Sequence, residues 1–282
     1  MRAEKTRAAI ASEQVAVEVD ERGARIASIV DRRTATEFLL VTPWGEAPSR
    51  AEPYAAGSSP EWHRCYAGGW HTLVPHAGDE RTVGGVEHPF HGEAAWRTWR
   101  EVARTAASCT HQVELDSVPI DATRTVAVAG DTVTVVQRLR NRGDGPVAFT
   151  WTEHPAFGPA VVSPRSTVRL AGADAGVEFP QDGAGLSGFR TLEVAGDAEV
   201  SISNPDTGAL VRLRWDARLM PYLHIWQEHN ASDGFPWWRR ISAIALEPAS
   251  RGYWPDGPEL GPVLLAAGET IEARFELAVG VR

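Results

Sequence analysis

The strongest constraint on the fold is a strict alternation of apolar and polar positions near the C-terminus. Between positions 271 and 279 every second residue is apolar: Ile271, Ala273, Phe275, Leu277 and Val279. Three of the four intervening positions carry charged residues, namely Glu272, Arg274 and Glu276. Because successive side chains of a β-strand point to opposite faces, this pattern predicts a strand with one buried face.

Shorter runs of the same kind recur along the chain and are separated by turn signals. We predict a proline-rich loop over 42–60 and strands over 15–19, 24–30, 37–40, 96–102, 123–128, 132–140, 147–152 and 211–215. No helical periodicity exceeds two turns. Short strands at regular spacing predict an all-β fold of stacked antiparallel sheets. We expect one domain spanning 1–282, with residues 1–12 frayed.

The composition argues against several classes of protein. The chain has 282 residues, a formal net charge of −9 and no basic stripe, so we expect neither nucleic acid nor a membrane as a partner. No apolar run could span a bilayer or serve as a signal peptide, which predicts a cytoplasmic protein with Cys65 and Cys109 reduced. Lys5 is the only lysine, which excludes Schiff-base catalysis and lysine-containing phosphate loops.

A stretch over 66–99 is rich in histidine, tryptophan and glycine. It holds four of the nine histidines, at positions 71, 76, 88 and 91, together with three tryptophans. Glycine and proline interrupt it too often for a helix. Since loops on a rigid scaffold often carry binding groups, we predict that it forms one wall of a polar, aromatic-lined pocket. The alternative is a long surface loop with solvated histidines.

Within this stretch, His88, His91 and Glu93 are candidate metal ligands of the kind that cupin-like enzymes use. A strand would place His91 and Glu93 on one face and His88 on the other, so this hypothesis requires a bend at Pro89. We therefore expect no metal and no organic cofactor, and keep the metal-dependent β enzyme as an alternative.

Two titratable residues, His154 and Glu247, each end an apolar run and precede a proline. The residue before proline is held extended, so the direction of each side chain is restricted. Burial would raise the pKa of the Glu247 carboxyl, which suits a general base. The alternatives are a histidine bonded to backbone and a strand-end glutamate in water.

The eleven tryptophans exceed what a core of this size requires. Flat aromatic rings can pack on the C–H faces of sugars while a ring N–H meets a hydroxyl. Five tryptophans lie in loop-like or strand-end contexts that suit such a role: Trp70, Trp226, Trp237, Trp238 and Trp254. The alternative is that most of them belong to the core.

Several short motifs, taken together in this order, resemble the aldose 1-epimerase (galactose mutarotase-like) family over nearly the whole chain. They are Gly23–Ile29 with Thr36–Leu39, Gly68–Trp70 with Leu73–Gly78, His91-Gly92 followed by Trp96 and Trp99, Thr152–Phe157, Leu246–Pro248 and Leu265–Thr270. The chain departs from the family at 78–81, where members usually place an arginine close to the glycine. Arg81 is the nearest match there, and Arg64 is a second candidate.

The resemblance implies a β-supersandwich and a cofactor-free reaction on a hexose or related aldose. It implies Glu247 as the base on the anomeric hydroxyl and His154, protonated, as the acid on the ring oxygen. It implies that His91 and Arg81 bind the sugar. We further expect Trp70, His76, Trp226 and Gln227 to contact a sugar or sugar derivative, in a monomer or homodimer. A non-catalytic sugar-binding protein of the same fold is the alternative.

Overall fold

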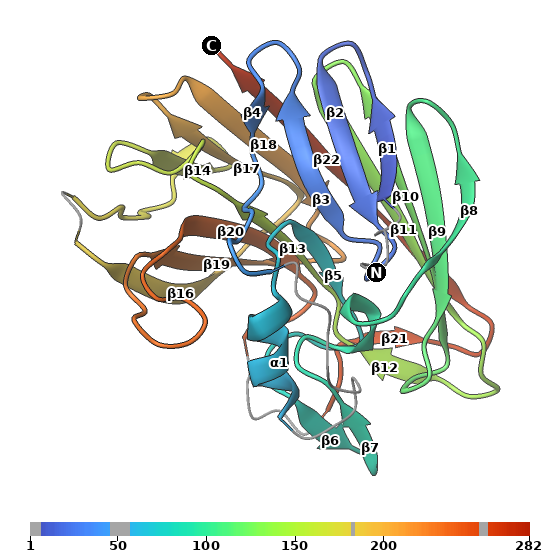
Figure 1. Ribbon diagram of the computed structural model, residues 1–282. Helices are drawn as coiled ribbons and strands as arrows, with labels where there is room; N and C mark the ends of the chain where they lie inside the picture. Colours follow the sequence, from blue (N-terminus) through green and yellow to red (C-terminus); the bar gives the residue numbers. More distant parts are fainter. Residues whose placement is uncertain (1–6, 46–56, 182–183, 254–258) are drawn as a thin grey trace, which may run out of the picture.

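The computed structural model describes residues 7–45, 57–181, 184–253 and 259–282. These form two large antiparallel sheets that pack face to face (Figure 1). Sheet I contains, in spatial order, β1 (Arg7–Ala11), β2 (Val15–Asp20), β3 (Ile26–Asp31), β5 (Trp70–Leu73), β13 (Thr152–Phe157), β20 (Ser242–Ala249), β19 (Tyr222–His229) and β16 (Leu186–Glu193). The short strand β4 (Thr36–Glu37) pairs with β3.

Sheet II runs in the order β15 (Ala173–Asp174), β14 (Thr167–Leu170), β17 (Asp197–Asn204), β18 (Ala209–Asp216), β22 (Thr270–Val281), β11 (Thr132–Asn141), β10 (Ile120–Ala129), β9 (Ser108–Glu114) and β8 (Arg100–Arg104). Two small sheets pair β12 (Val147–Phe149) with β21 (Val263–Leu265), and β6 (Arg81–Val83) with β7 (Val86–His88). The helix α1 (Ser58–Cys65) and the 3₁₀ turn η1 (Glu93–Ala95) complete the fold. Figure 1 shows α1 and the β6–β7 hairpin at the same end of the molecule.

The all-β prediction is confirmed, and the alternation near the C-terminus forms the long strand β22 at the centre of sheet II. Phe275, Leu277 and Val279 point into the core between the sheets. Two expectations were wrong. Residues 7–11 are not frayed but form β1, which pairs with β2 along its whole length. The predicted loop over 42–60 ends early because α1 begins at Ser58, while its residues 46–56 lie outside the described part.

The core contains one ionic network that joins the two sheets. Arg124 of β10 and Glu153 of β13 are both fully buried, with Nη1 2.9 Å from Oε2. Trp70 and Trp151 each donate an indole N–H to the Glu153 carboxylate, at 2.6 and 3.0 Å. Gln137 accepts from Arg124 at 2.7 Å. Charges in an apolar core are tolerated only when they are paired and hydrogen-bonded, so this network fixes β13 against sheet II.

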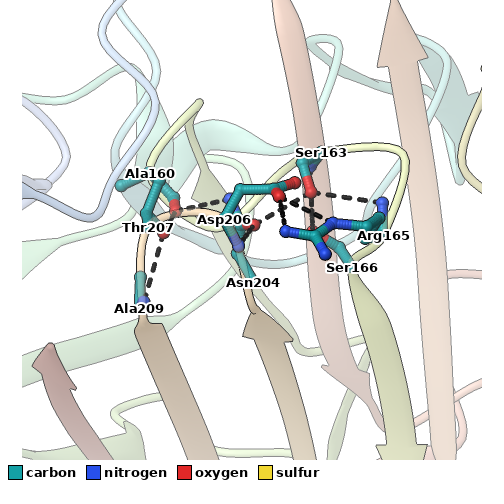
Figure 2. A network of polar contacts seen from close by, with 8 residues as sticks. All are labelled: Ala160, Ser163, Arg165, Ser166, Asn204, Asp206, Thr207 and Ala209. Atoms are coloured by element: carbon teal, nitrogen blue, oxygen red, sulfur yellow. Dashed lines mark hydrogen bonds and ion pairs between the residues drawn. The ribbon is translucent and has the colours of Figure 1, made fainter. Parts of the chain in front are cut away.

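A second polar network fixes the loop that carries the chain from β13 in sheet I to β14 in sheet II (Figure 2). Ser163 donates to the Asn204 side chain at 2.9 Å, and Asn204 in turn donates to the Ala160 carbonyl at 3.0 Å. Arg165, also in this loop, forms an ion pair with Asp206, which lies in the turn between β17 and β18. The loop after β13 is therefore tied to a hairpin of the opposite sheet.

None of the described helices is long and apolar enough to cross a bilayer. Cys65 and Cys109 are both free thiols, as predicted.

We propose that the chain is one folding unit. The first strands, β1 to β3, share sheet I with β19 and β20 from near the C-terminus, and β22 lies between β11 and β18 in sheet II. Limited proteolysis should therefore cut only exposed loops. The resulting N- and C-terminal fragments should stay together and elute as one species in gel filtration without denaturant. Two stable fragments that separate and remain folded would contradict a single domain.

Candidate functional site

A cavity of about 270 Å³ lies on the face of sheet I that points away from sheet II. Its floor comes from three neighbouring strands, β13, β20 and β19, which contribute His154, Glu247 and Trp226. Its walls come from α1, from the segment 77–91 and from the loop between β19 and β20. The remaining lining residues are Trp62, His63, Tyr66, Ala77, Gly78, Asp79, Phe90, His91, Phe189, His224, Trp237 and Tyr253.

His154 and Glu247 face each other across two paired strands. β13 and β20 pair antiparallel with Thr152 opposite Ala249 and Ala156 opposite Ala245, a register that sets His154 opposite Glu247. His154 Nε2 lies 3.5 Å from Glu247 Oε1. Both side chains are at least nine-tenths shielded from water. The two residues that precede prolines thus form a carboxyl–imidazole pair at the floor of the cavity.

Burial moves the pKa values of the pair in opposite directions. It raises the pKa of Glu247 to about 8 and lowers the pKa of His154 to about 4. Desolvation disfavours the charged form of each group, which accounts for both directions. Between these two pH values the pair holds one proton, and burial favours placing that proton on the carboxyl. This order is the reverse of the ionised glutamate and protonated histidine that the family resemblance implied for the reacting state.

His91 is held in a fixed orientation beside this pair. Its backbone has a φ of 65°, which is uncommon for a residue other than glycine. Its Nδ1 accepts the backbone N–H of Gly78 at 3.0 Å. Burial, and then the charge of His154, keep the pKa of His91 well below its ordinary value, so the ring is neutral. A neutral imidazole that accepts at Nδ1 must carry its proton on Nε2, so His91 is a hydrogen-bond donor.

The next residue, Gly92, explains why this turn needs a glycine. Its φ is 75°, and a Cβ placed there would lie 2.6 Å from the Val74 carbonyl oxygen. A side chain at this position would push the turn away from the segment directly after β5. The His-Gly sequence therefore reflects the tight approach that brings His91 into the cavity.

The walls of the cavity are mainly aromatic. Trp62 stacks on Tyr66 with ring centroids 6.0 Å apart, and Trp226 lies 5.7 Å from Trp237. Phe90 and the Trp62 ring are 6.1 Å apart. These rings leave few polar groups to solvate a buried charge, which is the physical reason for the raised pKa of Glu247.

The structure brings together four residues proposed from the sequence: Glu247, His154, His91 and Trp226. Trp237, from the tryptophan set, joins them. Arg81 and His76 line a smaller adjoining pocket of about 30 Å³ with Thr152 and Arg251. That pocket shares His224 and Tyr253 with the main cavity, so both residues lie beside the site rather than on its floor.

Two expected substrate contacts were wrong. Trp70 is fully buried in the core, where its indole N–H donates to Glu153, because it is His71 on β5 that faces the cavity side. Gln227 lies on the opposite face of β19 from Trp226 and donates to the Glu178 carbonyl at 2.9 Å. In each case a residue next to the predicted one points to the cavity, because successive side chains of a strand point to opposite faces.

Three other sequence candidates lie elsewhere. Arg64, the second candidate for a sugar-binding arginine, forms an ion pair with Glu61 on α1 at 2.7 Å. Trp238 is 55% exposed and does not line the cavity. Trp254 lies outside the described residues.

The metal-site alternative is not supported by the positions of its ligands. Glu93 is fully buried, and its carboxylate accepts the backbone N–H groups of Asp116 and Ser117 and pairs with Arg97. No cluster of three histidine, cysteine, aspartate or glutamate side chains suited to a metal ion exists in the described part of the chain. Glu93 instead holds η1 against the loop after β9.

Sequence reasoning missed several lining residues, of which Trp62, Tyr66 and His224 are the most informative. Trp62 and Tyr66 are four positions apart on and just after α1, a spacing that places side chains on one side of a helix. His224 is two positions before Trp226 and therefore shares its face of β19. Both spacings were available in the sequence, but α1 is too short for its periodicity to identify it as a helix.

No protein-family model matches the chain, and no curated protein matches it. Solved structures do. A galactose mutarotase related enzyme from Lactobacillus acidophilus has a TM-score of 0.70 and 16% identity, covering 98% of this chain and 97% of that one. A putative aldose 1-epimerase from Escherichia coli K12 has a TM-score of 0.69 and 17% identity, covering 99% and 100%.

An aldose epimerase homologue from C. elegans is similar over the same extent, with a TM-score of 0.68, 14% identity and 99% coverage of both chains. At identities this low, the structural similarity shows a shared fold, and it extends over nearly the whole length of the chain. The resemblance read from the motifs is thereby confirmed for the architecture, with its stacked antiparallel sheets. This chain has the galactose mutarotase-like fold.

Proposed function

We propose that the protein is an aldose 1-epimerase-like isomerase that interconverts the anomers of a sugar. One observation carries the proposal: Glu247 and His154, 3.5 Å apart, form a shielded proton donor and acceptor pair in a cavity walled by aromatic rings. Ring opening needs both groups at once, one at the anomeric hydroxyl and one at the ring oxygen. Aromatic faces suit the C–H faces of a sugar ring. The names of the similar structures agree with this reaction.

The cavity size favours a small ligand. At about 270 Å³ it lies just below the range of roughly 300–1,000 Å³ that is usual for drug-sized ligands. A single sugar ring or a close derivative matches that size. The His91 Nε2–H is a donor for a sugar hydroxyl or for the ring oxygen.

The single proton of the pair is sufficient for the chemistry. Transfer of that proton from Glu247 to His154 gives a carboxylate base and an imidazolium acid without exchange with solvent. Glu247 then accepts the proton of the anomeric hydroxyl, the C1–O5 bond breaks, and O5 takes the proton of His154. Rotation about C1–C2 and the reverse steps close the ring on the other face. Over the full cycle the substrate exchanges a proton with Glu247 at the anomeric oxygen and with His154 at O5. The protein ends in the protonation state in which it began.

A non-catalytic sugar-binding protein is the second candidate. The matched pair weighs against it, because binding alone requires no carboxyl of raised pKa facing an imidazole of lowered pKa. NMR exchange spectroscopy at the anomeric carbon, on a panel of aldoses, tests both candidates together. Anomer exchange faster than the spontaneous rate supports the isomerase. Sugar binding with no faster exchange supports the binding protein.

The rate should depend on pH as a bell. Below pH about 4 both groups are protonated and no base remains, whereas above about 8 both are deprotonated and no acid remains. We therefore expect kcat/KM to rise through the lower value, to be highest between them and to fall above the upper value. Polarimetry over pH 3.5–9, corrected for the spontaneous rate at each pH, measures this. A rate that keeps rising between pH 8 and pH 9 would contradict the need for a protonated partner.

A further inference from the structure

Tyr66 is a polar group at the cavity that the acid–base scheme does not use. It immediately follows α1 and lines the cavity, with only 5% of its surface exposed. Its hydroxyl is buried and has no hydrogen-bond partner among the described residues. A buried hydroxyl normally finds a partner, because leaving it unpaired costs its full desolvation energy. An orphaned hydroxyl beside a ligand cavity therefore points to a partner that the ligand supplies.

The ring of Tyr66 is held rigidly. Its backbone N–H donates to the His63 carbonyl, and its own carbonyl accepts the Thr42 hydroxyl at 2.5 Å. The ring packs against both Trp62 and His71, with centroids 6.0 and 5.8 Å away and an interplanar angle of 29° to each. Such packing leaves the ring few alternative positions, so the hydroxyl is placed before any ligand arrives.

The hydroxyl also lies within the electrostatic reach of the reacting pair. The centroids of the Tyr66 and His154 rings are 6.1 Å apart in a T-shaped arrangement. Burial, and next the negative charge of Glu247, raise the pKa of Tyr66 above its ordinary value. The phenol therefore stays protonated and acts as a hydrogen-bond donor, not as a base.

We propose that the Tyr66 hydroxyl donates a hydrogen bond to the sugar oxygen from which Glu247 takes the proton. This inference rests on the proposed function. When that proton leaves, negative charge builds on the anomeric oxygen until the C1–O5 bond breaks and the charge passes to O5. A fixed donor at the anomeric oxygen stabilises this charge, as donors of an oxyanion hole do. Tyr66 thus contacts the reacting oxygen, and no covalent bond to it forms.

The test is the Tyr66→Phe variant, which keeps the ring and its stacking and removes only the hydroxyl. Removing one donor of this kind lowers kcat by about 10²–10³-fold. We expect a fall in kcat of about 10²-fold, with KM changed by less than about threefold, because the contact strengthens in the transition state. The thermal midpoint should not fall, because the change removes a buried hydroxyl that the unliganded protein leaves unpaired.

Tyr222→Phe is the matched control. Tyr222 begins β19, is only partly buried and does not line the cavity, so its kcat should equal that of the wild type. The probes are the α-anomers of D-glucose, D-galactose and D-xylose, followed by polarimetry, with thermal unfolding measured on the same samples.

The outcomes separate this inference from the proposed function. An active wild type with a Tyr66→Phe variant of equal kcat overturns the role of Tyr66 alone. A variant that loses activity together with a clearly lower thermal midpoint overturns it too, because the hydroxyl would then have a structural partner. A rise in KM with unchanged kcat overturns the transition-state role. A wild type that accelerates none of the three reactions overturns the proposed function and this inference together.

Discussion

Replacing Glu247 by glutamine should lower kcat for anomer interconversion by about 10²–10⁴-fold, the usual contribution of a positioned proton-transfer group. The amide keeps the shape and polarity of the carboxyl but cannot accept the proton of the anomeric hydroxyl. Sugar affinity should persist, because the aromatic walls and His91 remain in place. Polarimetry for the rate and isothermal titration calorimetry for binding measure the two effects separately.

The partner of Glu247 provides an internal check. His154→Asn should lose a comparable factor, and the double variant should be little slower than either single variant, because groups that act as one unit are not additive. Glu272→Gln is the control, since Glu272 is an exposed residue of β22 far from the cavity lining, and it should keep full activity. Wild-type rates for Glu247→Gln on an aldose that the wild type converts would show that another group is the base.

Replacing Glu153 by glutamine should destabilise the protein by about 3–5 kcal/mol, the typical cost of removing one partner of a buried ion pair. Arg124 would keep its charge in a fully buried core position, and its Nε and Nη2 already lack hydrogen-bond partners among the described residues. The glutamine could still accept from the two indoles, so the lost charge pairing dominates the effect. Urea unfolding monitored by tryptophan fluorescence gives the free energy of unfolding.

A second substitution distinguishes charge from packing. Adding Arg124→Met to Glu153→Gln removes the unpaired cation, so the double variant should be more stable than Glu153→Gln alone. The exposed pair of Arg138 with Glu272 is the control, and Glu272→Ala should cost at most about 1 kcal/mol. Free energies that simply add in the double variant would show that Arg124 and Glu153 do not depend on each other.

This core network also affects the site. Glu153 and His154 are neighbours on β13, and Thr72 and His71 are neighbours on β5, so each strand sends one residue into the core and the next toward the cavity side. Gln137 donates to the Thr72 hydroxyl at 2.9 Å, which fixes β5 to sheet II as Glu153 fixes β13. Weakening the network should therefore loosen the position of His154 as well as the core.

Much of the fold was accessible from local pattern. Alternation in β22, β10 and β11 reports which face is buried, because each of these strands has one face in water. The pairing of β10 with β11 follows from the turn at Gly130. His154 and Glu247 were found because each ends an apolar run before a proline and matches a motif of the resembling family.

For the central strands, the sequence could not show which face of the sheet each side chain points to. β5 is buried on both faces, so its sequence shows no alternation that could place Trp70 in the core and His71 toward the cavity. The same holds for Gln227 on β19, where six of the eight residues are buried. Only the register with neighbouring strands decides which face is which.

The amino-acid sequence by itself determined the all-β class and the main strands, and it identified the two residues of the proposed acid–base pair, because hydrophobic period and proline geometry act over a few residues. Only the tertiary structure decided that these two groups lie 3.5 Å apart, that α1 and the residue after it supply Trp62 and Tyr66 to the cavity, and that burial raises the pKa of Glu247 and lowers the pKa of His154. The reason is that these pKa values depend on desolvation, and desolvation is produced by side chains brought together from distant parts of the chain.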